Sequence, residues 1–572
     1  MESGGGWMAE NIWRETYRHP VPWDSAFPLL SMPDMLAATA ARVPGAPMLD
    51  FYGRKFSYSQ VHRAAQRIAC GLAAQGIQRG DRVGLFLPNV PHYVAAYYGA
   101  MIAGAVTVNF SPLYSVEELA HQVEDSGTRM LFTLTAKALL PTALAVLNAS
   151  RLETLVLGSV AGVLPLGKSL GYRLFKQADE AARPDDPRIL TFSQLLANDG
   201  NCAPLAIDAE SDLALLQYTG GTTGRPKGAM LTHQNLTANA RQCCVVDPDL
   251  DKADRIIGVL PFFHVFANTA VLNRTIFHGG EIVMLPRFDA AQTLAAIRRT
   301  RATSMPGVPT MFQALLDHKD VARTDFSSLR VCISGGAPLA SPLQQRFEAV
   351  TGARLIEGYG LTECSGIVSA NPYRGEGKPG TIGQPLPRTH VRLVDKEDPS
   401  KPAPPDEPGE MVIFGPQVMR GYWGRPDATA EAFLDGGLRT GDVGQIDADG
   451  FIRVVDRIKD MIAVAGFKVF PSEVEAVLYR HPSVRDALVI GIPDAYHGEV
   501  PKAFVTLEAG ASDTGDQLRT WLNAQLGKHE RVVAVEVRES LPRTLVGKLS
   551  RKELVAEERE KATAAGTPAP EA

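Results

Sequence analysis

The sequence predicts an α/β protein with a large N-terminal body and a small C-terminal domain. Between residues 31 and 339, apolar runs rich in β-branched residues alternate with stretches of helical periodicity, with Gly or Pro at the breaks. This alternation is typical of parallel sheets with crossover helices. After residue 372 short strands broken by Pro and Gly follow, and past residue 457 a mixed βα pattern begins. We expect a body of two α/β subdomains plus a β-rich subdomain (residues 1–456) and a small mobile α+β domain (457–556).

The body begins with a strand, helix, strand, helix and strand between residues 81 and 136. Later strands are expected at 152–160, 253–263, 279–286, 328–336 and 353–360, and in the β-rich part at 381–387, 390–395, 409–416 and 445–456. The uncharged run VAAYYGAMIAGAVTV (residues 94–108) is shorter than the ~18–20 apolar residues of a membrane-spanning helix. A buried helix that leads into a buried strand is therefore the better interpretation.

The C-terminal domain is expected to contain two helices and two strands. The helices are predicted at 471–484 and 515–527, and the strands at 486–494 and 502–510. Residues 557–572 are polar and rich in Ala and Pro, which favours a disordered tail.

Composition excludes several classes of protein. The 572 residues include 58 Lys and Arg against 63 Asp and Glu, a formal net charge of −5, and no long basic block, so binding to nucleic acid is not expected. The six cysteines form no CxxC pair and match neither a disulfide framework nor a zinc site. The first 30 residues lack a secretory signal pattern. These features favour a cytoplasmic protein in a reducing environment.

The strongest motif is QYTGGTTGRPKGAMLTH, from Gln217 to His233. A predicted strand leads into a turn of glycines, threonines and one lysine, which offers backbone N–H groups, hydroxyls and a cation for phosphate oxygens. A Walker A loop is excluded, because Pro226 precedes Lys227 and Gly228 follows it. Taken alone, such a turn could equally be a solvated loop.

The segment YTGGTTGRPKG, however, resembles the signature of the adenylate-forming superfamily, which includes acyl-CoA synthetases, luciferases and peptide-synthetase adenylation domains. The superfamily's other motifs follow in order: LPFFHVFA (260–267), SGGAPL (334–339), EGYGLTE (357–363), TGD (440–442), DRIKDMIAVAGFKVFPSEVE (456–475) and LPRTLVGK (541–548). The resemblance covers residues 30–555. It implies that a carboxylic acid and ATP form an acyl adenylate, which coenzyme A then converts to a thioester, with Mg²⁺ on the ATP phosphates.

The resemblance also implies which residues bind ATP and AMP. Tyr359 would offer a flat face to adenine, Asp442 would accept hydrogen bonds from the ribose hydroxyls, and Arg457 would make a second ribose or phosphate contact. Singly, an Asp in a Gly turn is usually a turn former. The full implied set is Thr219, Gly220, Gly221, Thr222, Thr223, Gly224, Lys227, Gly335, Gly336, Ala337, Glu357, Gly358, Tyr359, Gly360, Asp442 and Arg457.

Three residues are expected to be catalytic by the same resemblance. Lys548 would reach from the small domain to the α-phosphate and the carboxylate, Glu363 would bind Mg²⁺ with Thr219 as partner, and Thr362 would contact phosphate. Further implied positions are the hinge residue Lys459, and Gly466 and Phe467 at the coenzyme A arm.

The acid is expected to be a long- or medium-chain fatty acid. The segments at 228–239, 325–331 and 415–429 resemble bacterial fatty acyl-CoA synthetases, which places His264, Gly307 and Val308 at the acyl pocket. No Asp or Arg indicates a binding site for a substrate amine or for a second substrate carboxylate. The alternatives are a dicarboxylic or aromatic acid:CoA ligase and, against the intact motifs, a catalytically silent nucleotide-binding scaffold.

Two further points stay open at the level of sequence. The segment LPLGKSLGYRLFK (residues 164–176) is basic and mildly amphipathic, so it could rest on the inner membrane surface or be a solvated connector. The sequence also leaves open whether the chain forms a homodimer.

Overall fold

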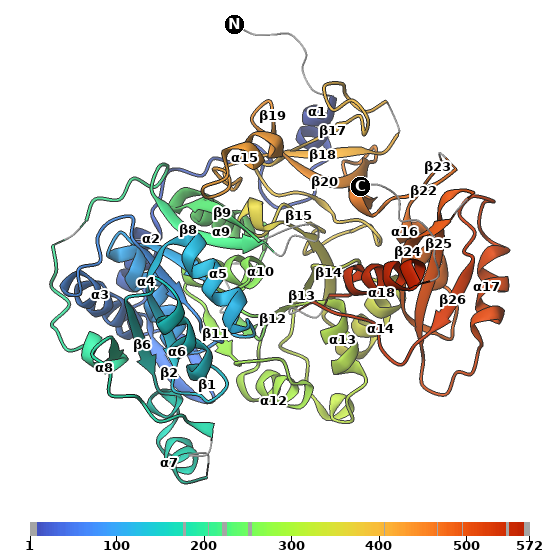
Figure 1. The fold of residues 1–572 in the computed structure, drawn as a ribbon. Helices are drawn as coiled ribbons and strands as arrows, with labels where there is room; N and C mark the ends of the chain where they lie inside the picture. Colours follow the sequence, from blue (N-terminus) through green and yellow to red (C-terminus); the bar gives the residue numbers. More distant parts are fainter. Residues whose placement is uncertain are drawn as a thin grey trace, which may run out of the picture.

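The computed structural model describes residues 8–175, 179–203, 205–219, 226–249, 254–404, 407–465, 467–494, 496–544 and 548–564. Two large sheets form the body, a smaller sheet covers one end of it, and a fourth sheet belongs to the C-terminal lobe at the right of Figure 1. The α/β fold expected from the sequence is confirmed.

The first body sheet has seven strands. Its order is β7 (Ile189–Thr191), β6 (Thr154–Gly158), β5 (Thr128–Leu134), β3 (Arg82–Leu85), β4 (Val106–Asn109), β8 (Leu213–Thr219) and β9 (Lys227–Thr232). All neighbours are parallel except β8 and β9, which pair antiparallel with Thr219 opposite Lys227. The predicted phosphate loop therefore joins two antiparallel strands at the edge of this sheet.

The second body sheet has nine strands. Its order is β16 (Gln384–Pro385), β15 (Ser369–Ala370), β14 (Arg354–Tyr359), β13 (Val331–Gly335), β12 (Ser304–Gly307), β10 (Arg255–Gly258), β11 (Glu281–Met284), β1 (Pro47–Phe51) and β2 (Arg54–Ser57). The six strands from β14 to β1 are parallel. Ligands of open parallel sheets gather beyond the carboxyl ends of the strands, where the SGGAPL and EGYGLTE motifs begin.

Helices cover the two sheets. They are α2 (Met32–Arg42), α3 (Tyr58–Ala74), α4 (Pro91–Ile102), α5 (Val116–Ser126), α6 (Leu140–Ala149), α7 (Leu166–Phe175), α8 (Phe192–Leu195), α9 (His233–Val245), α10 (Val265–Ala267), α11 (Arg274–His278), α12 (Ala290–Thr300), α13 (Pro309–Leu316) and α14 (Ser341–Thr351). Short turns at Val160–Val163 (η1), Asn268–Asn273 (η3) and Val321–Arg323 (η4) complete the body.

The uncharged run at residues 94–108 forms the greater part of α4 and then β4, as predicted. Every residue of α4 from Pro91 to Met101 is buried, and α4 packs against α3. Across the described parts of the chain, no helix combines the length and the apolar character needed to cross a membrane.

The β-rich subdomain contains β17 (His390–Val394), β18 (Gly409–Phe414), β19 (Phe433–Leu434), β20 (Gly437–Ile446) and β21 (Ile452–Arg457), with helix α15 (Pro426–Ala432). The N-terminal helix α1 (Met8–Thr16) is attached to it, because the buried indole of Trp13 donates a 2.9 Å hydrogen bond to the carbonyl of Gly450.

The C-terminal lobe begins after η6 (Ile458–Asp460). Its sheet contains β22 (Ile462–Val464), β23 (Phe467–Val469), β24 (Val484–Asp494), β25 (Gly498–Leu507) and β26 (Ala534–Val537), and its helices are α16 (Pro471–Leu478), α17 (Gly515–Asn523) and α18 (Arg551–Ala564). Two apolar clusters of its own lie on the two faces of this sheet. The lobe thus has the separate core that a domain requires.

The structure corrects the expectation that disorder begins at residue 557. Helix α18 continues to Ala564, because Leu554 is buried beside Phe504 and Glu558 pairs with Lys502 at 2.9 Å and with Lys561 at 2.7 Å. Residues 565–572 lie outside the described part of the chain.

The structure also corrects the expectation that no cysteines pair. Cys70 on α3 and Cys202 in the segment before β8 form a disulfide. The two cysteines are 132 residues apart in sequence, so their spacing carries none of the short-range signal of a CxxC motif. Cys243, Cys244, Cys332 and Cys364 are free and buried.

Candidate functional site

Lys548 extends from the small lobe to the carboxyl end of β13 in the body. Its side chain passes directly over Gly336: a Cβ built on that glycine would meet Cε of Lys548 and would lie 3.0 Å from Nζ. Gly336 also has a φ of +82°, which disfavours any side chain. The Thr544 N–H donates a 2.7 Å hydrogen bond to the Lys548 carbonyl, and the Lys548 N–H donates a 3.2 Å hydrogen bond to the Thr544 hydroxyl.

A second cluster surrounds the carboxylate of Asp442, whose side chain is 3% exposed. The Tyr359 hydroxyl donates a hydrogen bond to Oδ2, and Nε of Arg457 donates one to Oδ1 at 2.9 Å. Asp442 and Arg457 lie opposite each other on β20 and β21, whereas Tyr359 ends β14. Each carboxylate oxygen has two acceptor positions, and each of these two hydrogen bonds uses one of them.

A third cluster lies at the base of the phosphate loop. Glu363 in η5 (Thr362–Cys364) accepts a 2.8 Å hydrogen bond from the Tyr422 hydroxyl, and Nζ of Lys227 lies 5.1 Å above the ring of the same tyrosine. Thr219 faces Lys227 across the hairpin. Tyr422 was not among the predicted site residues, although it lies in the GYWGRP segment.

The three clusters adjoin one another, because the charges of Arg457 and Asp442 act on Lys548 and the charges of Asp442 and Glu363 both act on Lys459. Lys548 interacts electrostatically with the Asp442 cluster: burial, followed by the nearby positive charge of Arg457, lowers the pKa of Lys548 to about 8, while Asp442 opposes that shift. The charge of Asp442 is in turn the main cause of the raised pKa of Arg457. The site thus brings three cations and two carboxylates together, a composition suited to an anionic, hydroxyl-bearing ligand.

The remaining predicted nucleotide residues occupy the same strand ends. Gly335 ends β13, and Gly336 and Ala337 follow it; Glu357, Gly358 and Tyr359 end the neighbouring strand β14, and Gly360 follows that strand. Burial raises the pKa of Glu357 to about 8, although a hydrogen bond from the Leu339 backbone opposes that shift. Residues Gly220, Gly221, Thr222, Thr223 and Gly224 lie outside the described residues.

The predicted acyl-pocket residues lie next to this site. His264 is the N-cap of α10, with Nδ1 accepting a 3.3 Å hydrogen bond from the Phe266 backbone. Burial and the adjacent charge of Lys548 lower the pKa of His264 to about 3, so its imidazole is neutral. Gly307 ends β12 and Val308 caps α13 with its side chain buried.

The predicted hinge residue lies beside this cluster, because the charges of Arg457, Asp442 and Glu363 all act on the amine of Lys459. Lys459 lies in η6, between the last strand of the body and the first strand of the lobe. Phe467 is 60% exposed and stacks on His529 with ring centroids 5.0 Å apart. Gly466 lies outside the described residues.

The site fits Mg²⁺ bound together with a phosphate ligand. Within the described residues, no group of three or more His, Cys, Asp or Glu could hold a metal ion. Mg²⁺ typically needs no such cage, because it keeps several waters and binds one or two carboxylates plus substrate phosphates. Glu363 supplies one carboxylate at the base of the phosphate loop, with Thr219 beside it.

Comparison with known proteins identifies the family. Residues 36–423 match the model of the AMP-binding enzyme family, and residues 473–548 match its C-terminal domain. The chain is 39% identical to a long-chain-fatty-acid–CoA ligase of Bacillus subtilis (strain 168), over 98% of this chain and 99% of that protein.

Solved structures agree with this assignment. ATP-bound MatB from Rhodopseudomonas palustris is 28% identical, with a TM-score of 0.80 over 93% of this chain and 100% of that one. The anthranilate CoA ligase AuaEII in complex with anthranoyl-AMP is 26% identical, with a TM-score of 0.83 over 95% of this chain and 100% of that one. The chain belongs to the AMP-binding enzyme family.

Proposed function

We propose that this enzyme converts long-chain fatty acids to their coenzyme A thioesters. It is an adenylate-forming acid:CoA ligase that uses ATP and coenzyme A. The observation that carries the proposed chemistry is the position of Lys548, which crosses from the small lobe to Gly336 beside Asp442 and Arg457. The proposed acyl-chain length of the substrate rests on the similarity to the B. subtilis ligase and on the apolar surroundings of His264.

In the first half-reaction, a carboxylate oxygen of the acid attacks the α-phosphorus of ATP and the bond to pyrophosphate breaks. No protein nucleophile is needed, so rate enhancement depends on positioning and on charge stabilisation. We assign Asp442, held by Tyr359 and Arg457, to the ribose hydroxyls, and Lys548 to the negative charge that develops between the carboxylate and the α-phosphate.

Lys227, Thr219, Thr362 and the residues 220–224 are assigned to the phosphates. Glu363 would hold Mg²⁺ there, with Tyr422 fixing the orientation of its carboxylate through the 2.8 Å hydrogen bond. Bound Mg²⁺ would neutralise charge on the phosphates and favour the departure of pyrophosphate.

In the second half-reaction, the coenzyme A thiol loses its proton, its sulfur attacks the acyl carbon, and the bond to AMP breaks. Lys548 has no role in this step, so we propose that the lobe (residues 457–556) rotates about Lys459 relative to the body (residues 1–456). Gly466 and Phe467 would then approach the site. Phe467 is exposed in the present arrangement, which leaves its ring available for this approach.

A panel of acids tests the substrate. AMP release is measured with coenzyme A, ATP and Mg²⁺ for saturated acids of 4 to 18 carbons, together with anthranilate, ferulate and malonate. We expect the highest kcat/KM among the long-chain acids. Preference for an aromatic or dicarboxylic acid would overturn the proposed substrate and favour the alternative, for which the fold shared with the anthranilate ligase is the supporting observation.

We further propose that helix α7 contacts the inner membrane surface of a cytoplasmic enzyme. Leu166 and Leu170, one turn apart, are 92% and 62% exposed. Lys168 attaches the helix to the body, because Nζ donates a 2.9 Å hydrogen bond to the Tyr52 carbonyl. An exposed apolar pair on a fixed amphipathic helix favours lipid contact.

Vesicle sedimentation tests this contact. The double variant Leu166→Glu/Leu170→Glu should lose most binding to anionic phospholipid vesicles while AMP release from a water-soluble acid is unchanged. A matched control is Leu113→Glu/Leu205→Glu, which removes two exposed leucines elsewhere. Equal sedimentation of all three proteins would contradict the proposal.

A homodimer also stays a prediction, to be tested by light scattering.

A further inference from the structure

A cavity of about 440 Å³ lies between the two body sheets, on the side opposite the small lobe. This volume falls within the ~300–1,000 Å³ of typical small-molecule sites. Most of its wall is apolar and comes from β1, β2, α3, α4, β6, η1 and α8. The principal apolar residues are Leu49, Phe56, Val61, Leu157, Val163 and Phe192.

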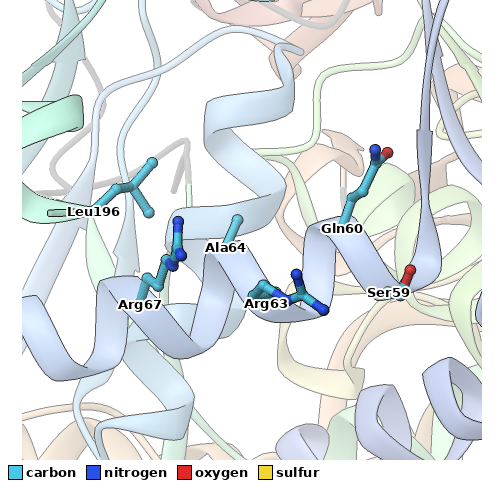
Figure 2. Close-up of a pocket in the computed structure, with 6 residues that line it drawn as sticks. All are labelled: Ser59, Gln60, Arg63, Ala64, Arg67 and Leu196. Atoms are coloured by element: carbon cyan, nitrogen blue, oxygen red, sulfur yellow. The ribbon is translucent and has the colours of Figure 1, made fainter. Parts of the chain in front are cut away.

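A smaller pocket of about 200 Å³ adjoins the cavity along helix α3. The two share Gln60, Ala64 and Leu196. Figure 2 shows this outer pocket, with Arg63 and Arg67 one turn apart on α3 and Leu196 near Arg67. The outer pocket therefore adds a basic rim to the apolar cavity.

Two more arginines, Arg54 and Arg183, line the cavity itself. Arg54 donates to the Gly162 carbonyl at 2.7 Å, and Arg183 donates to the Ile189 carbonyl at 3.0 Å. Among the described residues, no ion pair involves these two arginines or Arg63 and Arg67. Nε of Arg67 is buried without a hydrogen-bond partner within the same residues.

Fewer acidic side chains than arginines lie near the two pockets. Arg67 contributes slightly to the lowered pKa of Asp199, after the hydrogen bonds from Asn201, and Glu180 accepts a 3.3 Å hydrogen bond from Ser159 in the cavity wall. The four arginines thus leave a net positive charge around an apolar space, which is complementary to an anion with an apolar tail.

His92 supplies a polar group deep in the wall. His92 is 6% exposed, and its Nδ1 has no hydrogen-bond partner among the described residues. Its ring packs edge-on against Phe192, with centroids 4.7 Å apart. Gly158 makes room for it, because a Cβ there would lie 2.9 Å from the ring. A buried polar atom without a partner normally indicates a water or a ligand.

This cavity is separate from the catalytic site. In the nine-stranded sheet, β14 and β1 are five strand spacings apart, or about 24 Å at ~4.8 Å per spacing. In the seven-stranded sheet, β6 and β8 are four spacings apart, or about 19 Å. Figure 1 likewise shows β1, β2, β6 and α8 on the side away from the C-terminal lobe.

We propose that the cavity is a second ligand site that binds an acyl chain with a carboxylate head group. The tail lies along the apolar wall between Leu49 and Phe192. The carboxylate lies at the basic rim formed by Arg63 and Arg67. The ligand class follows from the cavity itself, so the site does not depend on which acid is activated at Lys548.

Binding of radiolabelled hexadecanoate, measured by equilibrium dialysis without ATP, tests the site. Ala64→Trp fills the shared part of the two pockets and should remove one bound molecule per chain, or weaken it at least tenfold. The matched control Ala73→Trp places the same side chain on an exposed position of α3 that lines neither pocket. Equal binding by the two variants would overturn the proposal.

A second pair of measurements tests the head group and does not depend on the folding of Ala64→Trp. Arg63→Glu/Arg67→Glu should weaken hexadecanoate binding about tenfold and leave hexadecanol binding unchanged. Equal loss of both ligands would contradict carboxylate recognition. Delivery of hexadecanoate from zwitterionic vesicles, compared with delivery from solution, shows whether the ligand enters from a membrane or from water.

AMP release from hexadecanoate is measured in parallel with every variant. Loss of the dialysis signal with catalysis retained supports a separate site. Retained binding by a wild-type protein that activates no long-chain acid would overturn the proposed substrate and leave the second site intact.

Discussion

Lys548 is the residue on which the proposed chemistry depends most directly. It lies over Gly336 and its charge lowers the pKa of His264, and both burial and the charge of Arg457 favour its neutral form. An anionic ligand at this position would reverse that balance, because opposite charge favours the protonated amine. The lysine is therefore set up to respond to ATP and the acid together.

Replacing this lysine should separate the two half-reactions. Lys548→Ala is expected to lower adenylation by ~10²–10³-fold, by analogy with the loss of one preorganised donor, and to spare thioester formation from supplied acyl-AMP. Pyrophosphate exchange and thioester formation are measured separately, with Lys552→Ala, an exposed lysine nearby, as control. An equal loss in both half-reactions would refute the assignment.

The raised pKa of Glu357 predicts that the stability of the protein depends on pH. Its pKa is raised from about 4.5 to about 8 in the folded protein, so between these values the folded state binds more protons than the unfolded state. The free energy of unfolding should therefore fall as pH rises from about 5 to 8. The change is a few kcal/mol at most, since one pKa unit corresponds to about 1.4 kcal/mol.

Urea unfolding of the ligand-free protein at pH 5, 6.5 and 8 measures this effect. Glu357→Gln keeps the size of the side chain and removes the titration, so its stability should change less over the same interval. A wild-type protein and variant with parallel pH profiles would show that Glu357 is not protonated at neutral pH.

At the scale of elements, the connection between β21 and β22 is the region where the two lobes join. Arg457 ends one strand beside Asp442, and Ile462 begins the next strand in the other lobe. The few residues between them would absorb the backbone rotation of any lobe movement. Lys459 lies in the middle of this segment.

Proline at this position should impair one half-reaction more than the other. Lys459→Pro fixes φ and is expected to slow thioester formation more than adenylation, because the lobe already presents Lys548 to the body. Lys459→Ala is the control for loss of the side chain. If thioester formation by the proline variant is unchanged, the rotation does not occur at this residue.

The sequence predicted the elements whose signal is local. The strand and helix series of the body and the glycine-rich strand ends follow from hydrophobic periodicity and turn residues, and the motifs were located by resemblance. The extension of α18 was missed because Glu558 depends on Lys502, a distant partner. Tyr422 was missed because its contact with Glu363 spans 59 residues, which no spacing rule detects.

At the scale of the whole molecule, the disulfide between Cys70 and Cys202 connects two distant segments of the body. Cross-linking residues 132 apart restricts the unfolded chain, an effect of typically ~2–4 kcal/mol. No spacing pattern in the sequence indicates this pair, because it depends on how α3 and the segment before β8 come together in the fold.

Reduction of the disulfide should lower the thermal stability of the protein. Cys70→Ser/Cys202→Ser is expected to unfold at a lower temperature than the oxidised wild type and to be insensitive to reductant. Thiol titration of the unreduced, denatured wild type should give four free thiols, since six cysteines less one pair leaves four. Six titratable thiols would show that the bond does not form in solution.

The passage of Lys548 over Gly336 limits how the specificity of this enzyme could be altered by engineering. Strand ends beside a substrate pocket are natural targets for mutagenesis, but any side chain at position 336 would push the lysine away as well as strain the backbone. Most variants at this position in a mutant library would lose catalysis, so the library could not reveal activity toward new acids. Variation is better directed at His264 and Val308, which border the site without lying in the path of the lysine.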